Sequence, residues 1–290
     1  GHGENTDVVT TMYCRPWDVA KYSRAKQTRP MILCEYAYSR GNSTGDLWSY
    51  WRVFQEEGHA QGGFIWDFQD RAIRQPQDPA RGGLFKPVRP GEKSFWAYGG
   101  DFGPPGTPSD GNMCCNGIVG TDRAPHPAAW EVQHVYQPIT VRPLDLAART
   151  VEVRSWFDVT DVRDIAAAAW RVTADGEEIQ RGSLADLALA PREKKVVAVP
   201  VRPFEPRPGA EYWLELVFTL KRDLPWAAAG HELAWDQLQL PDSAPPRPLA
   251  TESRTSLRTF RGGGRVTVAG KDFEVAFDVG AGTMTSLVYR

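Results

Sequence analysis

The sequence predicts a multidomain protein: part of a parallel (β/α)8 barrel, then a β-sandwich, then the beginning of a further β-sandwich domain. Three observations predict this order. Short apolar runs alternate with a helical pattern up to about Pro127, apolar and polar residues alternate after Gln137, and a proline-rich segment, PDSAPPRP, precedes a last stretch of strands. A chain of 290 residues also exceeds the usual size of one domain.

In the first part, three apolar runs have the length and composition of strands. The predicted strands are residues 6–13 (TDVVTTMY), 31–34 (MILC) and 63–68 (GFIWDF). Between the second and third, apolar residues recur at helical spacing, and the helix is expected to begin at Ser43 or Thr44 and to stop at Gly58. Such strands, separated by helices, are typical of a parallel sheet buried on both faces. Three strands cannot close an eight-stranded barrel, so we expect the chain to begin inside a larger domain.

The second part carries the period-two pattern of half-buried strands. The predicted strands lie within residues 150–159, 166–182, 194–201 and 211–220. Asp175-Gly176 predicts a hairpin turn, and turns at intervals of about ten residues are typical of a β-sandwich. The expected domain limits are 1–129 for the barrel part, 130–241 for the sandwich, 242–250 for a linker and 251–290 for the start of the last domain. The glycine- and proline-rich stretch 68–127 is expected to form loops over the barrel mouth.

The composition excludes several classes of function. A formal net charge of −2 gives no electrostatic footprint for nucleic acid or an anionic membrane, and no apolar run approaches the roughly 20 residues that span a bilayer. Four cysteines are too few for a disulfide scaffold, which favours a cytoplasmic location, and the spacing of the five histidines fits no zinc site. We therefore predict no nucleic-acid partner, no membrane and no structural zinc.

A polar or aromatic residue ends each predicted strand of the barrel part, where the chemistry of such barrels gathers. Glu35 follows the apolar run 31–34, and burying a carboxylate is costly unless the protein uses it. Tyr13 and Trp66 stand at the ends of the neighbouring strands. A phenol can hold a carboxylate ionised by donating a hydrogen bond, and an indole can line a sugar pocket. This arrangement suits glycoside hydrolysis, which needs two carboxylates, although these strand ends nominate one. A salt bridge or a helix cap is the alternative explanation for Glu35.

Several motifs resemble one enzyme family. The segments TRPMILCEYAYSRGNS, QGGFIWDFQD, YGGDFG with TPSDGNMCCNG, and DRAPHPAAWEVQHVYQP resemble the C-terminal half of the TIM barrel in the lac-type β-galactosidases of glycoside hydrolase family 2. LPWAAAGHELAWDQLQL resembles the end of the immunoglobulin-like β-sandwich that follows that barrel, and the last strands resemble the start of the terminal β domain. The resemblance implies a retaining hydrolase that releases terminal β-D-galactose from β-galactosides such as lactose, and a homo-oligomer for the full-length enzyme.

The resemblance also implies roles for single residues. Glu35 would be the nucleophile that forms a covalent galactosyl-enzyme, and Tyr13 would hydrogen-bond its carboxylate. The implied substrate-binding residues are Tyr36, Ala37, Tyr38, Trp66 and Asn116. Asn116 and the backbone carbonyl of Met113 would ligate a sodium ion (Na+) near the sugar. The acid/base glutamate and the main ligands of a magnesium ion (Mg2+) belong to an earlier part of the barrel, so the chain alone is expected to be inactive.

Two departures from the family pattern concern the site. Tyr38 stands where the family usually has a histidine that touches the sugar, and Ser109 stands where an asparagine lies near a second magnesium ion. Two other functions stay open: a family 2 hydrolase of another β-glycoside, such as a glucuronide or a mannoside, and a non-catalytic carbohydrate-binding or structural β-sandwich. Asp67 and Asp70 are expected to bond neighbouring loops, and the tryptophans of the second part are expected in the sandwich core or an interface.

Overall fold

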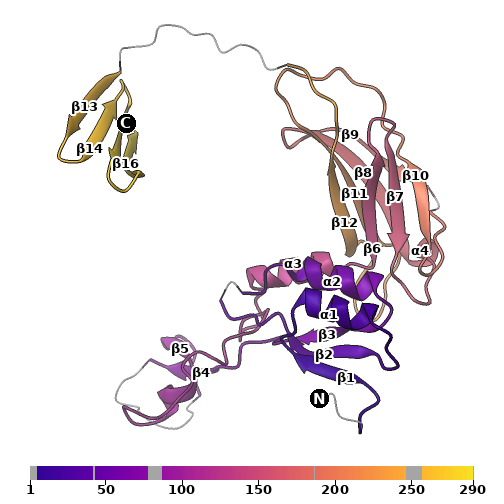
Figure 1. Cartoon of the computed structure of the whole chain (residues 1–290), viewed down its shortest axis with the longest axis horizontal. Coiled ribbons are helices and arrows are strands. Elements are labelled where there is room, and N and C mark those ends of the chain that lie inside the picture. Colours follow the sequence, from indigo (N-terminus) through magenta and orange to yellow (C-terminus); the bar gives the residue numbers. More distant parts are fainter. Residues whose placement is uncertain (1–4, 42, 78–86, 186, 246–256, 290) are drawn as a thin grey trace. The chain divides into compact units, whose positions relative to one another are not determined.

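The computed structural model describes residues 5–41, 43–77, 87–185, 187–245 and 257–289 (Figure 1). Two compact units make up the chain. The first contains the residues up to Pro203 together with Tyr212–Pro241, and the second contains Phe204–Glu211 together with the residues from Asp242 onward. Among the described residues, no helix has both the length and the apolar character needed to span a bilayer.

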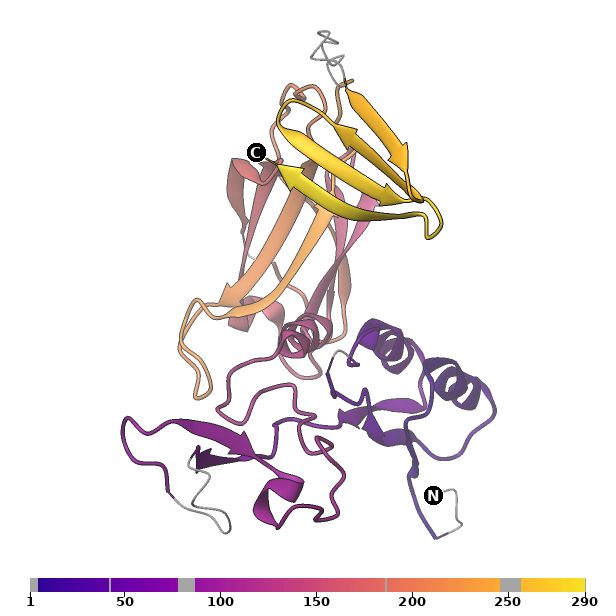
Figure 2. The same cartoon turned by 90° about the vertical axis from the view of Figure 1, so that its left-hand side faces the viewer.

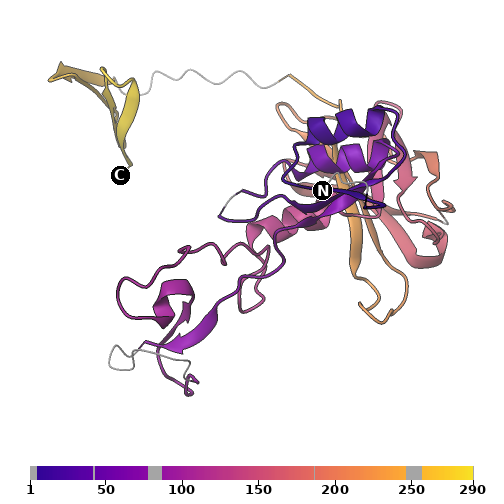
Figure 3. The ribbon, with the colours of Figure 1, turned by 60° about the horizontal axis from the view of Figure 1, so that its bottom comes forward.

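A three-stranded parallel sheet in the order β1-β2-β3 opens the first unit. Its strands are β1 (Val9–Met12), β2 (Met31–Tyr36) and β3 (Ala60–Ile65), and they alternate with the helices α1 (Pro16–Arg24) and α2 (Leu47–Glu56). The two helices lie side by side on one face of the sheet (Figure 1, Figure 3). Proline in the first turn of α1 suits the start of a helix, because its fixed φ is helical. Asp18 near the start and Arg24 at the end have the charges that the helix dipole favours.

The core of this part lies between the sheet and the two helices. Leu33 of β2, Val19 of α1 and Leu47 of α2 are fully buried there. Cys34 and Phe64 belong to the opposite face of the sheet and are exposed. Burial in β2 alternates from Met31 to Cys34, because successive side chains of a strand point to opposite faces, and a register irregularity between Leu33 and Tyr36 then places Tyr36 instead of Glu35 on the buried face. The described sheet is therefore covered on one face, whereas the sequence pattern predicts burial on both.

The predicted strands 6–13 and 31–34 are confirmed as β1 and β2, whereas β3 begins earlier than the predicted segment 63–68. The strand already includes Ala60, Gln61 and Gly62 ahead of the predicted first residue, and it ends at Ile65. A Cβ atom at Gly63 would lie only 2.9 Å from Cβ of Leu33, so the close approach of β2 and β3 requires glycine here.

The helix α2 starts later than predicted and stops close to the predicted point. Asp46, rather than Ser43 or Thr44, precedes its first residue; Asp46 has a left-handed backbone (φ 60°), and its carboxylate accepts a hydrogen bond from the hydroxyl of Ser49 at 2.7 Å. The helix ends at Glu56, shortly before Gly58. The helix α1 has no counterpart among the predicted elements, because its nine residues hold few apolar side chains.

A long segment with short elements follows β3. It contains the antiparallel strands β4 (Ile73–Pro76) and β5 (Ser94–Ala97), the 3-10 helix η2 (Gly99–Phe102) and the helix α3 (Pro127–Val135). Backbone hydrogen bonds join residues 67–71 to residues 114–119, and one of them runs from the N–H of Asp67 to the carbonyl of Asn116 at 2.7 Å. Two parts of the predicted loop region are thus tied together directly after the end of β3.

Two antiparallel sheets form the rest of the first unit. The three-stranded sheet has the order β10-β7-β6, and the four-stranded sheet has the order β12-β11-β8-β9. Their strands are β6 (Ile139–Asp145), β7 (Thr150–Ser155), β8 (Ala166–Ala174), β9 (Glu177–Leu184), β10 (Lys194–Ala198), β11 (Tyr212–Leu220) and β12 (Glu232–Gln239), with the short helix α4 (Val162–Ile165) before β8. Every second residue of β11 is buried, as its pattern predicts. Asp175 and Gly176 both have positive φ (51° and 85°), which the predicted hairpin turn requires.

The tryptophans of these sheets divide between core and surface. Trp170 in β8 is 5% exposed, which confirms the prediction of a core residue. Trp226 is 60% exposed and contacts the ring of His231 edge-on, with the ring centres 5.6 Å apart. Trp226 is therefore not a core residue, because it lies on the connection between β11 and β12 instead of on a strand, and a place in an interface stays a prediction.

The second unit contains a four-stranded antiparallel sheet, drawn in yellow in Figure 2. Its strands follow one another in the order β13 (Arg258–Gly262), β14 (Arg265–Ala269), β15 (Phe273–Asp278) and β16 (Thr283–Tyr289). Gly263 and Gly264 form the turn between β13 and β14 with positive φ (56° and 74°). The predicted limit between a linker 242–250 and a last domain from residue 251 lies outside the described residues.

Candidate active site

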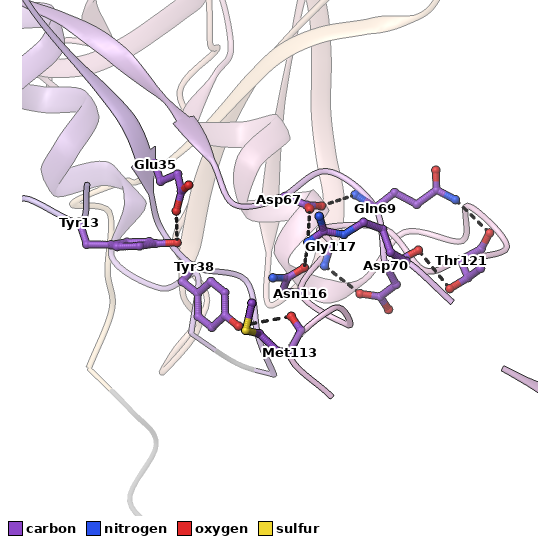
Figure 4. A network of polar contacts seen from close by, with 11 residues as sticks. Tyr13, Glu35, Tyr38, Asp67, Gln69, Asp70, Met113, Asn116, Gly117 and Thr121 are labelled. Atoms are coloured by element: carbon purple, nitrogen blue, oxygen red, sulfur yellow. Dashed lines mark hydrogen bonds and ion pairs between the residues drawn. The ribbon is translucent and has the colours of Figure 1, made fainter. Parts of the chain in front are cut away.

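The ends of β1 and β2 bring Tyr13 and Glu35 into contact (Figure 4). A register shift in the parallel pairing sets Met12 opposite Glu35, and the backbone N–H of Tyr13 donates to the carbonyl of Glu35 at 2.8 Å. The phenol of Tyr13 donates to Oε2 of Glu35, also at 2.8 Å. The carboxylate and the phenol named from the sequence are therefore direct hydrogen-bond partners.

Tyr13 stays protonated beside this carboxylate. Partial burial raises the pKa of Tyr13 well above its ordinary value, and the hydrogen bond to Glu35 and the negative charge of that residue raise the pKa further. Loss of the phenolic proton would place two negative charges side by side. The phenol therefore donates the hydrogen bond near neutral pH, and the carboxylate accepts it.

The backbone turns sharply at two of the strand ends. Tyr13 and Ala37 adopt left-handed conformations, with φ of 53° and 49°, which cost roughly 1 kcal/mol each for residues other than glycine. The turn at Ala37 leads into Tyr38. The ring of Tyr38 packs edge-on against that of Tyr13 with centres 6.1 Å apart, and its hydroxyl donates to the carbonyl of Met113 at 3.4 Å. Two tyrosine rings thus connect this carbonyl to the carboxylate (Figure 4).

Trp66 stands at the end of β3. Its N–H donates to the carbonyl of Tyr36 at 3.1 Å, and its carbonyl accepts from the N–H of Ser39 at 2.9 Å, so its backbone is fixed to the end of β2. The peptide bond between Trp66 and Asp67 is cis. The indole is half-buried, and the guanidinium of Arg71 lies 5.0 Å from its ring centre. Contact of this indole with a sugar stays a prediction.

Tyr36 faces the core instead of the strand ends. Its side chain is fully buried, its hydroxyl pairs with that of Tyr136 at 2.6 Å, and Nε1 of Trp51 donates to it at 3.2 Å. Burial also raises the pKa of Tyr36. Glu35 and Tyr36 are successive strand residues, so they point to opposite faces of the sheet. We therefore assign the side chain of Tyr36 to the support of the site and not to the substrate.

Asn116 belongs to the segment that is tied to the chain after Trp66. It is fully buried, its Oδ1 accepts from Arg71 at 3.2 Å, and its Nδ2 finds no hydrogen-bond partner among the described residues. Arg71 also pairs with Asp67 at 2.9 Å. Asn116, Arg71 and Asp67 therefore form one polar network, and its guanidinium contacts the indole of Trp66. Figure 4 labels Asn116 and Asp67 of this network.

Asp70 bonds a neighbouring loop, as predicted, whereas the side chain of Asp67 bonds residues of its own segment. Oδ1 of Asp67 accepts from the N–H of Gln69 at 2.9 Å, and Oδ1 of Asp70 accepts from the N–H of Gly117 at 2.8 Å. Gly117 has no room for a side chain, because a Cβ atom there would lie 2.2 Å from the backbone nitrogen of Asp70. Both carboxylates thus have partners within these loops, and the carboxylate of Asp70 joins two of them.

Comparisons with known proteins match most of the chain. Residues 5–141 match the family model described as "Glycosyl hydrolases family 2, TIM barrel domain", and residues 151–241 match the model "Beta-galactosidase, domain 4". A beta-galactosidase of Aeromonas hydrophila is 38% identical over 248 residues, and one of Priestia megaterium is 34% identical over 286 residues. Over residues 5–141 and 151–241 the chain is therefore similar to the TIM barrel domain of family 2 glycosyl hydrolases and to domain 4 of beta-galactosidase.

These two alignments cover 81% and 98% of the chain but 23% and 26% of the relatives. The chain therefore spans about a quarter of the length of these curated relatives. A solved structure, exo-chitosanase CsxA of Amycolatopsis orientalis with PNP-beta-D-glucosamine, aligns with 80% of this chain and 25% of its own. Its TM-score is 0.30 and its sequence identity to this chain is 10%, values too low to establish a shared fold.

The strand-end site holds one residue that sequence reasoning missed. The sequence motifs nominate no cationic residue at the strand ends, whereas in the structure Arg71 contacts Trp66, Asp67 and Asn116. The available signal in the sequence is that Arg71 follows Asp67 by four residues, a spacing at which the two charges can pair. Asn116 lies far along the sequence, so its contact with Arg71 had no local signal.

The described residues do not complete a sodium site. Oδ1 of Asn116 and the carbonyl of Met113 are oxygen donors of the type that hard cations bind. Two such oxygens are too few to surround an ion, and Arg71 already donates to Oδ1 of Asn116. No cluster of three or more His, Cys, Asp or Glu side chains among the described residues is arranged to hold a different metal.

A cavity of about 520 Å³ lies apart from the strand-end site. Residues of the loop after β2 and of the start of α3 line it, including Thr44, Cys115, His126 and Glu131. None of the strand-end side chains lines this cavity. The chemistry described above therefore concerns the open edge of the parallel sheet and not this cavity.

Proposed function

We propose that the protein to which this chain belongs is a retaining β-galactosidase, which removes terminal, non-reducing β-D-galactose from β-galactosides through a covalent intermediate on Glu35. The hydrogen bond of 2.8 Å from Tyr13 to Glu35, at adjacent strand ends, carries this proposal. The half-buried indole of Trp66 at the third strand end supports a sugar site. The relatives named beta-galactosidase support galactose as the sugar.

In the first step, a carboxylate oxygen of Glu35 attacks the anomeric carbon. The oxygen lone pair forms the new bond, while the bond from that carbon to the aglycone oxygen breaks and its electron pair leaves with the aglycone. An acid protonates the leaving oxygen, and its conjugate base later takes a proton from the water that hydrolyses the ester. Tyr13 keeps the carboxylate in one orientation by donating to Oε2 throughout.

The second carboxylate has no candidate at the described strand ends. Asp67 pairs with Arg71, and Asp70 accepts from the backbone of Gly117. We therefore propose that the acid lies in a part of the protein outside this chain. The chain of 290 residues alone is then inactive on β-galactosides, because losing one of two cooperating groups costs orders of magnitude in rate.

Two other functions receive less support. A β-glucuronide would need a cation for its carboxylate, and Arg71 is the cation near Trp66, but Asp67 already pairs with that guanidinium at 2.9 Å. A non-catalytic β-sandwich would give no reason for the hydrogen bond between Tyr13 and Glu35. Hydrolysis of β-galactosides accounts for more of the strand-end residues than either alternative.

The test is an assay of the complete gene product on an aryl β-galactoside. Glu35→Gln is expected to lower kcat/KM by about 10⁴-fold or more, because a neutral amide cannot form the covalent ester. The matched control is Glu232→Gln, at an exposed position at the start of β12, which should leave kcat/KM unchanged. Turnover that survives in Glu35→Gln would contradict the proposal.

The proposal extends to the domain organisation. The two antiparallel sheets of the first unit support an immunoglobulin-like sandwich at 130–241, after a barrel part at 1–129. A homo-oligomer, magnesium in the full-length enzyme and a cytoplasmic location follow from the family resemblance and stay predictions.

A further inference from the structure

Arg71 is held by contacts on three sides. Its guanidinium donates to Oδ1 of Asn116 at 3.2 Å, pairs with Oδ2 of Asp67 at 2.9 Å and lies 5.0 Å from the ring centre of Trp66. Its backbone N–H donates to the carbonyl of Cys114 at 2.9 Å, so its main chain is attached to the same segment as its side chain. An arginine held at both ends loses little further freedom when a ligand binds.

These contacts decide the orientation of the Asn116 amide. A guanidinium has donors and no acceptor, so it faces the amide oxygen and never the amide nitrogen. Asn116 is fully buried, and its Nδ2 remains without a partner among the described residues. The oxygen of this amide is thus committed to a cation that belongs to the chain itself.

A free cation at Oδ1 of Asn116 would meet the guanidinium at short range. Two positive charges at such a distance repel strongly in a partly buried site. Asp67 carries a single negative charge, which Arg71 already balances at 2.9 Å. Among the described residues, no second carboxylate pairs with this guanidinium to compensate an additional alkali-metal ion.

We propose that Arg71 is the built-in cation of the sugar site: its guanidinium takes the place beside Oδ1 of Asn116 where a sodium ion is expected from the family, and it makes substrate binding independent of sodium. This inference rests on the proposed β-galactosidase function. Arg71 acts as a positioning residue, since it fixes the amide of Asn116 and the indole of Trp66 by direct contact.

The experiment measures binding instead of turnover. A non-hydrolysable thio-β-galactoside is titrated into the complete gene product by calorimetry, in sodium chloride and in choline chloride at equal ionic strength. The dissociation constant of the natural protein is expected to differ by less than about twofold between the salts. Binding that weakens by about tenfold or more in choline would overturn the inference, and this measurement needs no variant.

Substitutions at Arg71 supply the second arm. In Arg71→Gln, binding should weaken by about tenfold in choline and be largely restored by sodium, because the amide oxygen becomes available to the ion. Arg71→Lys keeps the charge and should stay insensitive to sodium although its planar contacts are lost. Arg74→Gln, three residues further along in β4, is the matched control and should behave as the natural protein in both salts.

Sodium NMR relaxation separates this inference from the proposed function. The natural protein should show no sodium site, and Arg71→Gln should show one. A protein that binds the galactoside only with sodium keeps the proposed function and contradicts the role of Arg71. A protein that binds no galactoside contradicts the function, and the sodium signal alone then decides the role of Arg71.

Discussion

The sandwich and the strand ends of the barrel part differ in which residue types adopt left-handed backbone conformations. In the β8–β9 hairpin, the left-handed residues are Asp175 and Gly176, which are the residue types that such a turn favours. At the ends of β1 and β2, the left-handed residues are Tyr13 and Ala37, which gain nothing locally from this conformation. The surrounding structure imposes it.

The side chains of the two regions also differ, in their burial and in their polar contacts. The inward residues of β11 are fully buried, whereas Tyr13 at the end of β1 is 40% exposed and holds its hydroxyl against a carboxylate. The comparison indicates that the sandwich contributes mainly stability and that the barrel strand ends are arranged for chemistry. Four changes test this contrast, and they follow from the largest expected effect to the smallest.

Removing a large side chain from the sandwich core should give the largest effect on stability. Phe218 in β11 is fully buried, and Phe218→Ala is expected to lower the free energy of unfolding by about 3–5 kcal/mol through lost burial and a residual cavity. Urea denaturation measures this. The kcat/KM of the protein that remains folded should be unchanged; a loss of kcat/KM in fully folded protein would break the proposed division between the two regions.

Removing the phenolic hydroxyl at the strand end should lower activity and leave stability nearly unchanged. Tyr13→Phe deletes the donor to Glu35, and we expect kcat/KM to fall by about 10²-fold while the free energy of unfolding changes by less than about 1 kcal/mol. Tyr22→Phe removes a hydroxyl that donates to the carbonyl of Arg29 and serves as the control. Equal activity of the two variants would show that Tyr13 does not support the nucleophile.

A buried carboxylate in the sandwich predicts a pH dependence of stability. Burial raises the pKa of Asp236 to about 6, although Asp236 accepts from the N–H of Val141 at 2.6 Å and from Gln137 at 3.2 Å, and His134 lies nearby. The folded protein therefore keeps the proton between about pH 4 and pH 6, where the unfolded chain has lost it. Stability is fully present below this window and falls as pH rises through it.

The size of this fall is expected to be about 1–3 kcal/mol. Asp236→Asn keeps the acceptor for Val141 and cannot ionise, so its stability should lack this component. Urea denaturation of both proteins across the window measures the difference. Parallel curves for the two proteins would show that Asp236 ionises as easily in the folded protein as in the unfolded chain.

The smallest effect concerns the backbone itself. Ala37→Gly removes the steric cost of the left-handed conformation and should raise the free energy of unfolding by up to about 0.5 kcal/mol, after the extra freedom of glycine in the unfolded chain is subtracted. Ala167→Gly, at an exposed position inside β8, should lower it by about 0.5–1 kcal/mol. A change of the same sign in the free energy of unfolding for both variants would contradict the proposed difference between the strand-end backbone and the sandwich backbone.

The sequence was informative where a single physical pattern dominates. Period-two alternation located β11, and the pair Asp175-Gly176 located the turn between β8 and β9, because burial and turn chemistry act over a few neighbouring residues. The carboxylate of Glu35 was found because a charge after an apolar run is unusual. The start of β3 at Ala60 was missed because Ala60 pairs with Met31 of β2, and no local pattern reports a contact between strands.

The parts of the site that could not be predicted depend on contacts between distant segments. Arg71 reaches Asn116 across 45 positions of sequence, and no local pattern reports that meeting. Tyr36 is a different case. Regular alternation from the buried Leu33 would place Glu35 in the core and Tyr36 on the opposite face, but the irregular register between Leu33 and Tyr36 reverses this, and no local pattern in the sequence reports that irregularity.

Covalent trapping of the nucleophile tests the central claim most directly. The complete gene product is inactivated with a 2-deoxy-2-fluoro-β-galactoside whose slow hydrolysis lets the glycosyl-enzyme accumulate, and the labelled peptide is identified by mass spectrometry. We predict one fluorogalactosyl group on the peptide that contains Glu35, and no labelling of Glu35→Gln. A label on another carboxylate, or steady turnover of β-galactosides without any labelled peptide, would contradict the account.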